Sequence, residues 1–283
     1  MTAPGRAPAA AGEQIGPYRL LRRLGQGSLA TVYLAVDDAS GQPVALKLLS
    51  LAGAGDAPHE ARQRFLAEAE LARRLRHPDI ITILAAGESG GRGWLAMELM
   101  AGGDLGRYTL PARLLPEALV LGIGARLARA LAHAHRQGVV HRDLKPSNVL
   151  VDWPSSSVKL ADFGLARLAD AQGTRTGLML GSPVYMAPEQ LAGAAPTPAS
   201  DFYALGVTLF QLLAGRLPFE GGSMGELLRA AASAAPPDLQ TLRPELPATV
   251  AAAVAALLSK QPAARPQAGD ALADALQALL PPP

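Results

Sequence analysis

Four polar side chains near the middle of the 283-residue sequence have types and spacings that suit phosphate chemistry. Asp143, Lys145 and Asn148 fall within the segment VVHRDLKPSNVLV, and Asp162 follows 14 residues after Asn148. Apolar residues flank both polar stretches, so the polar side chains are expected at the ends of buried segments. Two carboxylates and an amide carbonyl are oxygen ligands of the kind that Mg²⁺ prefers and shares with phosphates. The pattern therefore indicates a magnesium-dependent reaction on a phosphate group.

A glycine-containing bend occurs near the start of the chain, in LGQGSLATVYLA. Gly25 and Gly27 lie between two predicted strands, where missing side chains would let backbone N–H groups approach phosphate oxygens closely. A simple hairpin turn has the same composition. The bend alone therefore does not decide between a phosphate site and an ordinary turn.

A single lysine interrupts the apolar run VALK. Burying Lys47 would be costly without an anionic partner, and Glu68 follows 21 residues later on a predicted helix. A pair between these two side chains would aim the ammonium group at the α- and β-phosphates of a nucleotide. The alternative is a surface lysine whose charged end reaches solvent.

The predicted elements change character near residue 100. Period-two patterns predict strands before it, and one helix, whereas long helical patterns follow it. The predicted strands are 18–25, 30–37, 43–49, 80–87 and 93–99, with a helix over 61–75, and the later helices are 116–137, 198–214, 249–260 and 268–280. A small strand-rich part thus precedes a larger helical one.

The ordered series GxGxxxxV, VALK, Glu68, HRDLKPSN, DFG and APE resembles the eukaryotic-type protein kinase family, and most of all its bacterial serine/threonine kinases. The resemblance covers nearly the whole chain. It implies an α+β fold of two lobes, in which a small antiparallel β-sheet lobe with one key helix precedes a larger, mainly helical lobe. The implied organisation is a disordered tail at 1–14, a kinase domain at 15–280 divided after residue 100, and a short tail at 281–283.

The resemblance also implies a reaction, the transfer of the γ-phosphoryl group of ATP to serine or threonine hydroxyls of proteins. Asp143 would accept or orient the proton of the substrate hydroxyl, and Lys145 would neutralise the γ-phosphate. Asn148 and Asp162 would hold Mg²⁺, which Mn²⁺ could replace. Lys47 and Glu68 would complete the catalytic set.

The nucleotide site implied by the resemblance is mostly apolar or built from backbone groups. The adenine ring would lie between Val32 and Ala45 on one side and Leu150 on the other. The Glu98 carbonyl and the Met100 amide would bind the edge of the adenine ring. The Asp104 carboxylate would lie near the ribose hydroxyls. The implied nucleotide-binding residues are Gly25, Gln26, Gly27, Val32, Ala45, Lys47, Glu98, Met100, Asp104 and Leu150. The sequence departs from the family pattern at the third glycine, where it has Ala30 with less backbone freedom.

Regulatory and substrate-positioning residues are implied between the DFG and APE motifs. Thr174 and Thr176 would be autophosphorylated, and Arg142 would bind the resulting phosphate. Ser182 would position the substrate hydroxyl.

Other polar residues are expected to support the fold. By the resemblance, Glu189 and Arg265 would form a buried ion pair, and Asp201 would hold the backbone around Asp143 because a buried carboxylate needs N–H donors. His133 and His135 are two positions apart on a predicted helix and point to different faces, so both are interpreted as helix surface or packing.

Composition limits the remaining functions. The chain has 49% hydrophobic residues, a net charge of +2 and no cysteine, which gives no indication of nucleic-acid binding and excludes disulfides, thiolate metal sites and cysteine nucleophiles. The longest apolar run, 249–258, is about half a membrane span. We expect a cytoplasmic chain without a membrane span that acts on protein substrates and could form a homodimer for trans-autophosphorylation.

Two other functions fit the same fold. A pseudokinase would keep the fold and signal by contacts, but such proteins usually lack the lysine, the catalytic aspartate or the metal-binding aspartate, all of which are present here. A small-molecule kinase of similar fold would generally lack the glycine-loop and APE patterns.

Overall fold

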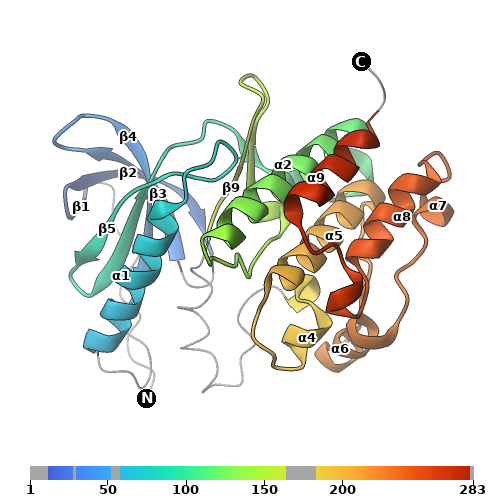
Figure 1. The fold of residues 1–283 in the computed structure, drawn as a ribbon. Coiled ribbons are helices and arrows are strands. Elements are labelled where there is room, and N and C mark those ends of the chain that lie inside the picture. Colours follow the sequence, from blue (N-terminus) through green and yellow to red (C-terminus); the bar gives the residue numbers. More distant parts are fainter. Residues whose placement is uncertain (1–11, 28–29, 52–57, 164–182, 281–283) are drawn as a thin grey trace. The chain divides into compact units, whose positions relative to one another are not determined.

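The computed structural model describes residues 12–27, 30–51, 58–163 and 183–280. The chain forms two compact units (Figure 1). The first consists of Met1–Arg74 and Thr82–Met100, and the second of Leu75–Ile81 and Ala101–Pro283.

The first unit contains a six-stranded sheet in the order β1-β2-β3-β4-β6-β5, with every neighbouring pair antiparallel. One helix, α1, packs against β5 and β6. The elements are β1 (Gln14–Ile15), β2 (Tyr18–Gln26), β3 (Ala30–Asp37), β4 (Pro43–Ser50), α1 (Pro58–Arg74), β5 (Ile83–Ser89) and β6 (Arg92–Met97). The predicted small sheet with one helix is confirmed.

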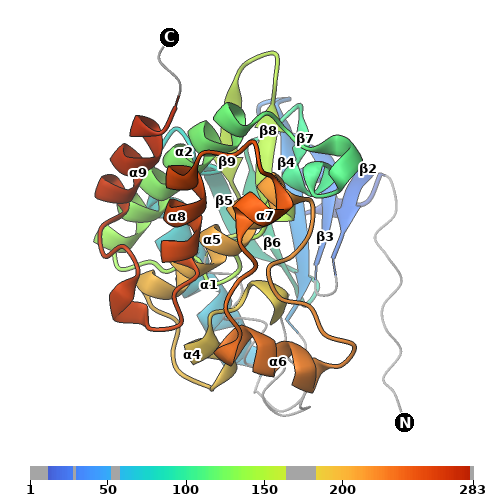
Figure 2. The same ribbon diagram turned by 90° about the vertical axis from the view of Figure 1, so that its right-hand side faces the viewer.

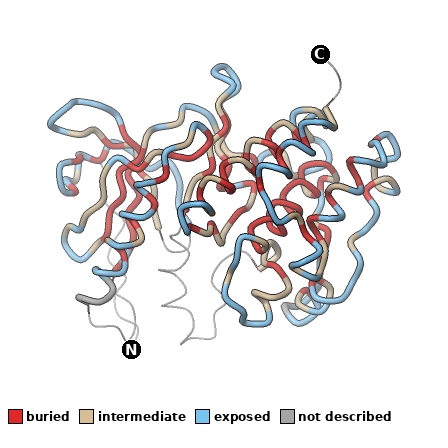
Figure 3. The backbone as a smooth tube through the Cα atoms, viewed as in Figure 1, coloured by how far each residue is buried: buried red, intermediate tan, exposed pale blue. Residues whose placement is uncertain are grey.

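The core of this unit depends on the central strand β4, which is buried from Val44 to Leu49. Continuous burial of this kind occurs in a strand that is covered on both faces. Next to it, the edge of the Tyr18 ring meets Trp94 with 5.4 Å between ring centroids. Figure 3 shows the buried positions along both units.

The second unit is mainly helical, as predicted. Helix α2 packs against both α9 and α5, which Figures 1 and 2 show from two sides. The helices are α2 (Glu117–Arg136), α4 (Pro188–Leu191), α5 (Pro198–Ala214), α6 (Met224–Ser233), α7 (Leu239–Leu242), α8 (Ala248–Leu257) and α9 (Gly269–Ala278). A three-stranded antiparallel sheet joins them, with β7 (Gly103–Asp104), β8 (Val149–Asp152) and β9 (Ser157–Leu160).

Helix α5 is the buried centre of the second unit. All residues from Ser200 to Leu213 except Gln211 are buried. The helix begins after Thr197, whose N–H donates to the Ser200 hydroxyl, and ends at Gly215, which has a left-handed φ of 72°. A helix that is apolar on all sides belongs in a core, so a carboxylate on it has to be paired.

The strand predicted over 80–87 begins three residues late because its first residues pair elsewhere. Ile80 bridges Leu160, and the N–H of Ile81 donates to the Leu160 carbonyl. These bonds tie the segment Leu75–Ile81 to the second unit, and β5 starts only at Ile83.

Among the described helices, none combines the length and the apolar character needed to cross a bilayer.

Lys260, just after α8, is half-buried, and its pKa is lowered by its surroundings. Its ammonium group lies 3.6 Å from the centroid of the Phe219 ring and donates to the Ala231 carbonyl at 2.6 Å. Burial, and secondly the nearby charge of Arg265, lower the pKa of Lys260 to about 8 from 10.5. Between these two pH values the unfolded chain holds a proton that the folded chain has lost, so this group makes stability rise with pH across that window.

We therefore expect the difference in unfolding free energy between the parent and Lys260→Met to shift in favour of the parent as the pH rises above 8. Urea unfolding of both proteins on either side of pH 8 measures it. The tyrosines that also titrate in this range are common to both proteins and cancel. A difference that does not vary with pH would contradict the assigned pKa.

Candidate functional site

The polar segment, residues 141–148, links α2 to β8 in the second unit and carries three of the predicted site residues. The Lys145 ammonium group donates to the Asp143 carboxylate at 2.7 Å. The Asn148 amide donates to the same carboxylate at 3.1 Å and to the Asp143 carbonyl at 2.7 Å. The Asp143 side chain is 24% exposed, so its carboxylate is held by two donors yet open to solvent.

The predicted support from Asp201 is confirmed. Its carboxylate, on the first turn of α5, accepts from the backbone N–H of His141 at 2.8 Å and from that of Arg142 at 2.9 Å. Asp201 is 1% exposed. A buried carboxylate that accepts from successive amides fixes the path of the backbone just before Asp143.

The His141 ring joins the polar segment to the strand end that carries Asp162. One ring nitrogen accepts from the Asp143 N–H at 3.2 Å, and the other lies 2.8 Å from the Ala161 carbonyl, to which it donates. The N–H of Ala161 in turn donates to the Asn148 carbonyl at 2.8 Å. The predicted metal ligands Asn148 and Asp162 are thus connected through Ala161, which is hydrogen-bonded to Asn148 and directly precedes Asp162.

Two residues of this region have unusual backbone angles. Arg142 has a φ of 74° and Asp162 a φ of 69°, both in the left-handed region. Non-glycine residues seldom adopt such angles, which cost about 1–3 kcal/mol each and persist where the surroundings enforce them. They fall next to Asp143 and at the candidate metal ligand, where side-chain direction matters most.

Two predicted nucleotide-binding residues of the second unit lie side by side. Asp104 on β7 pairs with Leu150 on β8. The Asp104 carboxylate accepts from the Gly106 N–H at 2.9 Å and caps the short helix that follows. One carboxylate oxygen thus has a structural role, and a role toward ribose remains a prediction.

The first unit brings together another part of the predicted set. Val32 on β3 lies opposite Lys47 on β4, and Ala45 shares a face of β4 with Lys47. Lys47 is only 9% exposed, and Glu68 is half-buried on α1. The pairing of Lys47 with Glu68 stays a prediction. At the end of β6, Glu98 accepts from the Thr82 N–H at 2.6 Å through its side chain, and Met100 closes the unit.

The two glycines of the predicted phosphate loop are not required by the fold of the described residues. Gly25 and Gln26 end β2, and the Gly27 N–H donates to the Ala30 carbonyl at 2.8 Å. Neither glycine has a positive φ. A Cβ at Gly25 would meet nothing within 4 Å, and one at Gly27 would make an ordinary contact of 3.6 Å with Ala30.

Thr174, Thr176 and Ser182 lie outside the described residues. Their predicted roles as phosphorylation sites and as a substrate-positioning hydroxyl therefore stay predictions.

Sequence reasoning missed two residues of this region. His135 was interpreted as helix surface or packing; its ring does pack against Phe202, with 5.4 Å between centroids, but the interpretation missed that it also lies 2.8 Å from the Asp201 carboxylate. Tyr185 donates to Gln211 at 2.6 Å, and burial raises its pKa to about 12, with an added contribution from the charge of Asp143. Tyr185 therefore stays a neutral donor in the field of Asp143. The sequence gives no signal for either contact, since each joins residues that are far apart along the chain.

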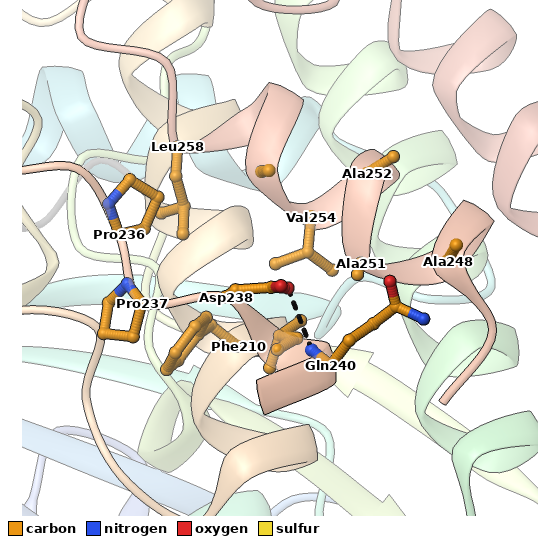
Figure 4. Close-up of a pocket in the computed structure, with 12 residues that line it drawn as sticks. Phe210, Pro236, Pro237, Asp238, Gln240, Ala248, Ala251, Ala252, Val254 and Leu258 are labelled. Atoms are coloured by element: carbon orange, nitrogen blue, oxygen red, sulfur yellow. Dashed lines mark hydrogen bonds between the residues drawn. The ribbon is translucent and has the colours of Figure 1, made fainter. Parts of the chain in front are cut away.

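A cavity of about 250 Å³ in the second unit lies between α5, α7 and α8 (Figure 4). Phe210, Val254 and Leu258 line it, with Asp238 at its edge, where the carboxylate caps α7. None of its lining residues belongs to the polar segment. We attach no function to it.

Comparison with known proteins places this geometry in a family. The family model described as "Protein kinase domain" matches residues 18–276. The chain is 40% identical over 263 residues to the DNA damage-responsive serine/threonine-protein kinase RqkA of Deinococcus radiodurans, covering 91% of this chain and 39% of RqkA. The chain thus spans about two fifths of the length of that relative.

Solved structures agree. The crystal structure of the Mycobacterium tuberculosis PknI kinase domain is 33% identical, with a TM-score of 0.77, and the match covers 96% of this chain and 100% of that domain. The structure of Rad53 1–466 in complex with AMP-PNP is 25% identical with a TM-score of 0.76, over 90% of this chain and 64% of that one. The polar segment, its anchor on α5 and these matches lead to one conclusion: this chain belongs to the protein kinase domain family.

Proposed function

We propose that this chain is a protein serine/threonine kinase that transfers the γ-phosphoryl group of ATP to protein hydroxyls. The observation that carries the proposal is the Asp143 carboxylate, held by Lys145 and Asn148 and open to solvent. The chain's membership in the protein kinase domain family and the name of its relative RqkA support protein substrates and a serine/threonine preference.

In the proposed reaction, Asp143 orients the substrate hydroxyl and accepts its proton. Lys145, 2.7 Å from that carboxylate, has an ammonium group that would lie beside the charge that develops on the transferred phosphoryl group. Such catalysis depends mainly on position and charge, and needs no covalent intermediate on the protein. The two donors on Asp143 provide the required rigidity.

The residues present suit a magnesium ion bound together with the nucleotide. The side-chain NH₂ group of Asn148 donates to Asp143, so the side-chain carbonyl oxygen of Asn148 is the atom left to act as a ligand. Asp162 supplies a carboxylate. Mg²⁺ needs few protein ligands since phosphates and water complete its shell. Accordingly, no cluster of three or more acidic or histidine side chains is required, and the described part of the chain has none. The ion would neutralise phosphate charge during transfer.

Nucleotide binding is proposed for residues of each unit. In the first, the open positions at Gly25 and Gly27 support close approach of phosphates, and Lys47, opposite Val32 and on the same face of β4 as Ala45, supplies a positive charge for an anionic ligand. In the second, Leu150 would contact the base and Asp104 the ribose. The complex of the related Rad53 with AMP-PNP supports an adenine nucleotide.

Regulation by autophosphorylation is part of the proposal. The Nε atom of Arg142 is buried and makes no hydrogen bond within the described residues. A buried donor without a partner costs about 1–3 kcal/mol, so a phosphate on Thr174 or Thr176 would be a favourable partner. A homodimer for transfer in trans and a cytoplasmic location remain predictions.

Incubation with γ-labelled ATP, Mg²⁺ and general protein substrates tests the function. We expect label on proteins as phosphoserine or phosphothreonine. Label found only as phosphotyrosine would contradict the hydroxyl class. Label that appears only on a small hydroxylated compound would indicate a small-molecule kinase instead.

A further inference from the structure

Two imidazole rings meet where the segment Leu75–Ile81 packs on α2. The ring centroids of His77 and His133 are 5.4 Å apart. The Nδ1 atom of His77 accepts from the backbone N–H of Asp79 at 3.1 Å. The Nε2 atom of His133 accepts from the side-chain NH₂ group of Gln137 at 3.0 Å. A ring nitrogen that accepts carries no proton, so both rings are neutral in this arrangement.

We propose that this histidine pair is an acid-sensitive latch, which holds the segment Leu75–Ile81 on α2 at neutral pH and loosens it when His77 takes up a proton. This conformational change goes beyond the proposed function and does not depend on it. Its consequence for catalysis rests on the proposed function and is tested separately.

The hydrogen bond of His77 cannot survive protonation of the ring. A protonated Nδ1 atom is a donor, and its partner, the backbone N–H of Asp79, can only donate as well. The side-chain amide of Gln137 differs, because it also has an oxygen and can turn to accept from a protonated His133. His77 is therefore the ring of the pair whose contact depends on pH.

The surroundings of His77 oppose a positive charge on its ring. His133, Arg126 and Arg136 face it from α2, whereas Asp79 lies on its own segment, with its carboxylate 4.0 Å from Nδ1. That carboxylate already accepts from Nε of Arg126 at 2.7 Å. Burial lowers the pKa of His77 below 6.5, the charge of Asp79 partly offsets this, and the positive charges on α2 lower the pKa further. Release of the segment lets His77 bind a proton, so release is favoured as the pH falls below 6.5.

The segment supports the end of strand β9. The N–H of Ile81 donates to the Leu160 carbonyl at 3.0 Å, and the N–H of Leu160 donates to the Asp79 carbonyl at 2.9 Å. Leu160 is the last residue of β9 and lies two residues before Asp162, the proposed metal ligand. Loosening of the segment would therefore remove backbone support from the strand end that carries Asp162.

One substitution keeps the hydrogen bond and removes the titration. The bond joins the His77 side chain to an N–H two residues later, which is the span of an Asx turn. In His77→Asn the side-chain oxygen can accept from the same Asp79 N–H, but the amide takes up no proton in this pH range. His133→Asn is the matched control, because it makes the same chemical change on α2 and leaves His77 free to titrate.

The test is hydrogen exchange of the Ile81 and Leu160 amides by NMR, with amides inside α5 as the reference. From about pH 7 to about pH 5 we expect protection at both amides to fall about threefold or more in the parent. His133→Asn should still show a fall, whereas His77→Asn should change less than about 1.5-fold. A parent without the fall, or a His77→Asn protein with the same fall as the parent, would overturn the proposal.

If His77→Asn fails to fold, a titration of the parent decides. The pH at which the His77 ring signals shift should lie below 6.5 and coincide with the loss of protection at Ile81. A midpoint above 6.5, or ring protonation without loss of protection, would overturn the latch.

The catalytic consequence has its own readout. The kcat of His77→Asn divided by that of the parent should rise about threefold or more from about pH 7 to about pH 5, and groups that titrate in both proteins cancel in this ratio. A constant ratio beside pH-dependent protection would overturn the catalytic consequence. If neither protein has activity, the proposed function fails, and hydrogen exchange alone decides whether the latch exists.

Discussion

Replacement of the central carboxylate, Asp143→Asn, is expected to lower kcat about 10²–10⁴-fold, the usual contribution of a positioned general base. The Asn side chain keeps the shape but cannot accept the proton of the substrate hydroxyl. KM for ATP should change little, because Asp143 is not among the proposed nucleotide contacts. Steady-state phosphorylation of a protein substrate measures both constants.

Asp274→Asn is the control for this prediction. It makes the same chemical change on α9, where the side chain is 75% exposed and pairs with Arg129. Its kcat should equal that of the parent. Asp143 is itself 24% exposed, so the Asn variant should remain folded, which thermal unfolding will show. A folded Asp143→Asn protein with parent-like kcat would contradict the assigned role.

The largest expected effect on stability comes from Glu189→Gln. The Glu189 carboxylate receives two hydrogen bonds, at 2.6 and 2.8 Å, from Arg265, whose side chain is fully buried, and this confirms the predicted ion pair. Removing one partner leaves a buried charge uncompensated and costs about 3–5 kcal/mol. For a unit of this size the loss corresponds to a fall in Tm of about 10 °C.

The pH dependence of Glu189→Gln provides a further check. Burial alone would raise the pKa of Glu189, but hydrogen bonds from Arg265 outweigh it and lower the pKa below 4.5. The contribution of the Glu189 carboxylate to stability is therefore present above pH 4.5 and is lost as the pH falls below it.

The control for Glu189→Gln is Asp270→Asn, which breaks the exposed pair with Arg136 and should cost less than about 1 kcal/mol. Equal effects of both variants at neutral pH would contradict the account.

Elements with strong local signals could be predicted from the sequence. The bounds of α5, Pro198–Ala214, agree with the prediction because a proline opens the helix and Gly215 ends it. The helix predicted over 249–260 ends earlier, at Leu257, because the N–H of Ser259 donates to the Ala256 carbonyl three residues back instead of continuing the four-residue pattern. Helix α6 was not predicted, since after Met224 the only large apolar residues in its sequence MGELLRAAAS are the adjacent Leu227 and Leu228, which show no helical period.

In the candidate site, too, features with a local sequence signal could be predicted and features that depend on packing could not. The polar segment has a local motif, so Asp143, Lys145 and Asn148 could be named from the sequence. The strained angle at Arg142 and the bond between His135 and Asp201 could not, because they depend on how α2 and α5 pack. Two histidines on one predicted helix have the same local surroundings in the sequence, and only packing distinguishes His135 from His133.

The measurement that tests the central claim most directly is site-resolved mass spectrometry of the purified chain after incubation with ATP and Mg²⁺, beside Asp143→Asn. We expect the parent to gain phosphate on Thr174, Thr176 or added protein substrates, on serine or threonine only, and Asp143→Asn to gain at least about a hundredfold less in the same time. Absence of phosphate from the parent and from all added proteins would contradict it and would favour a pseudokinase.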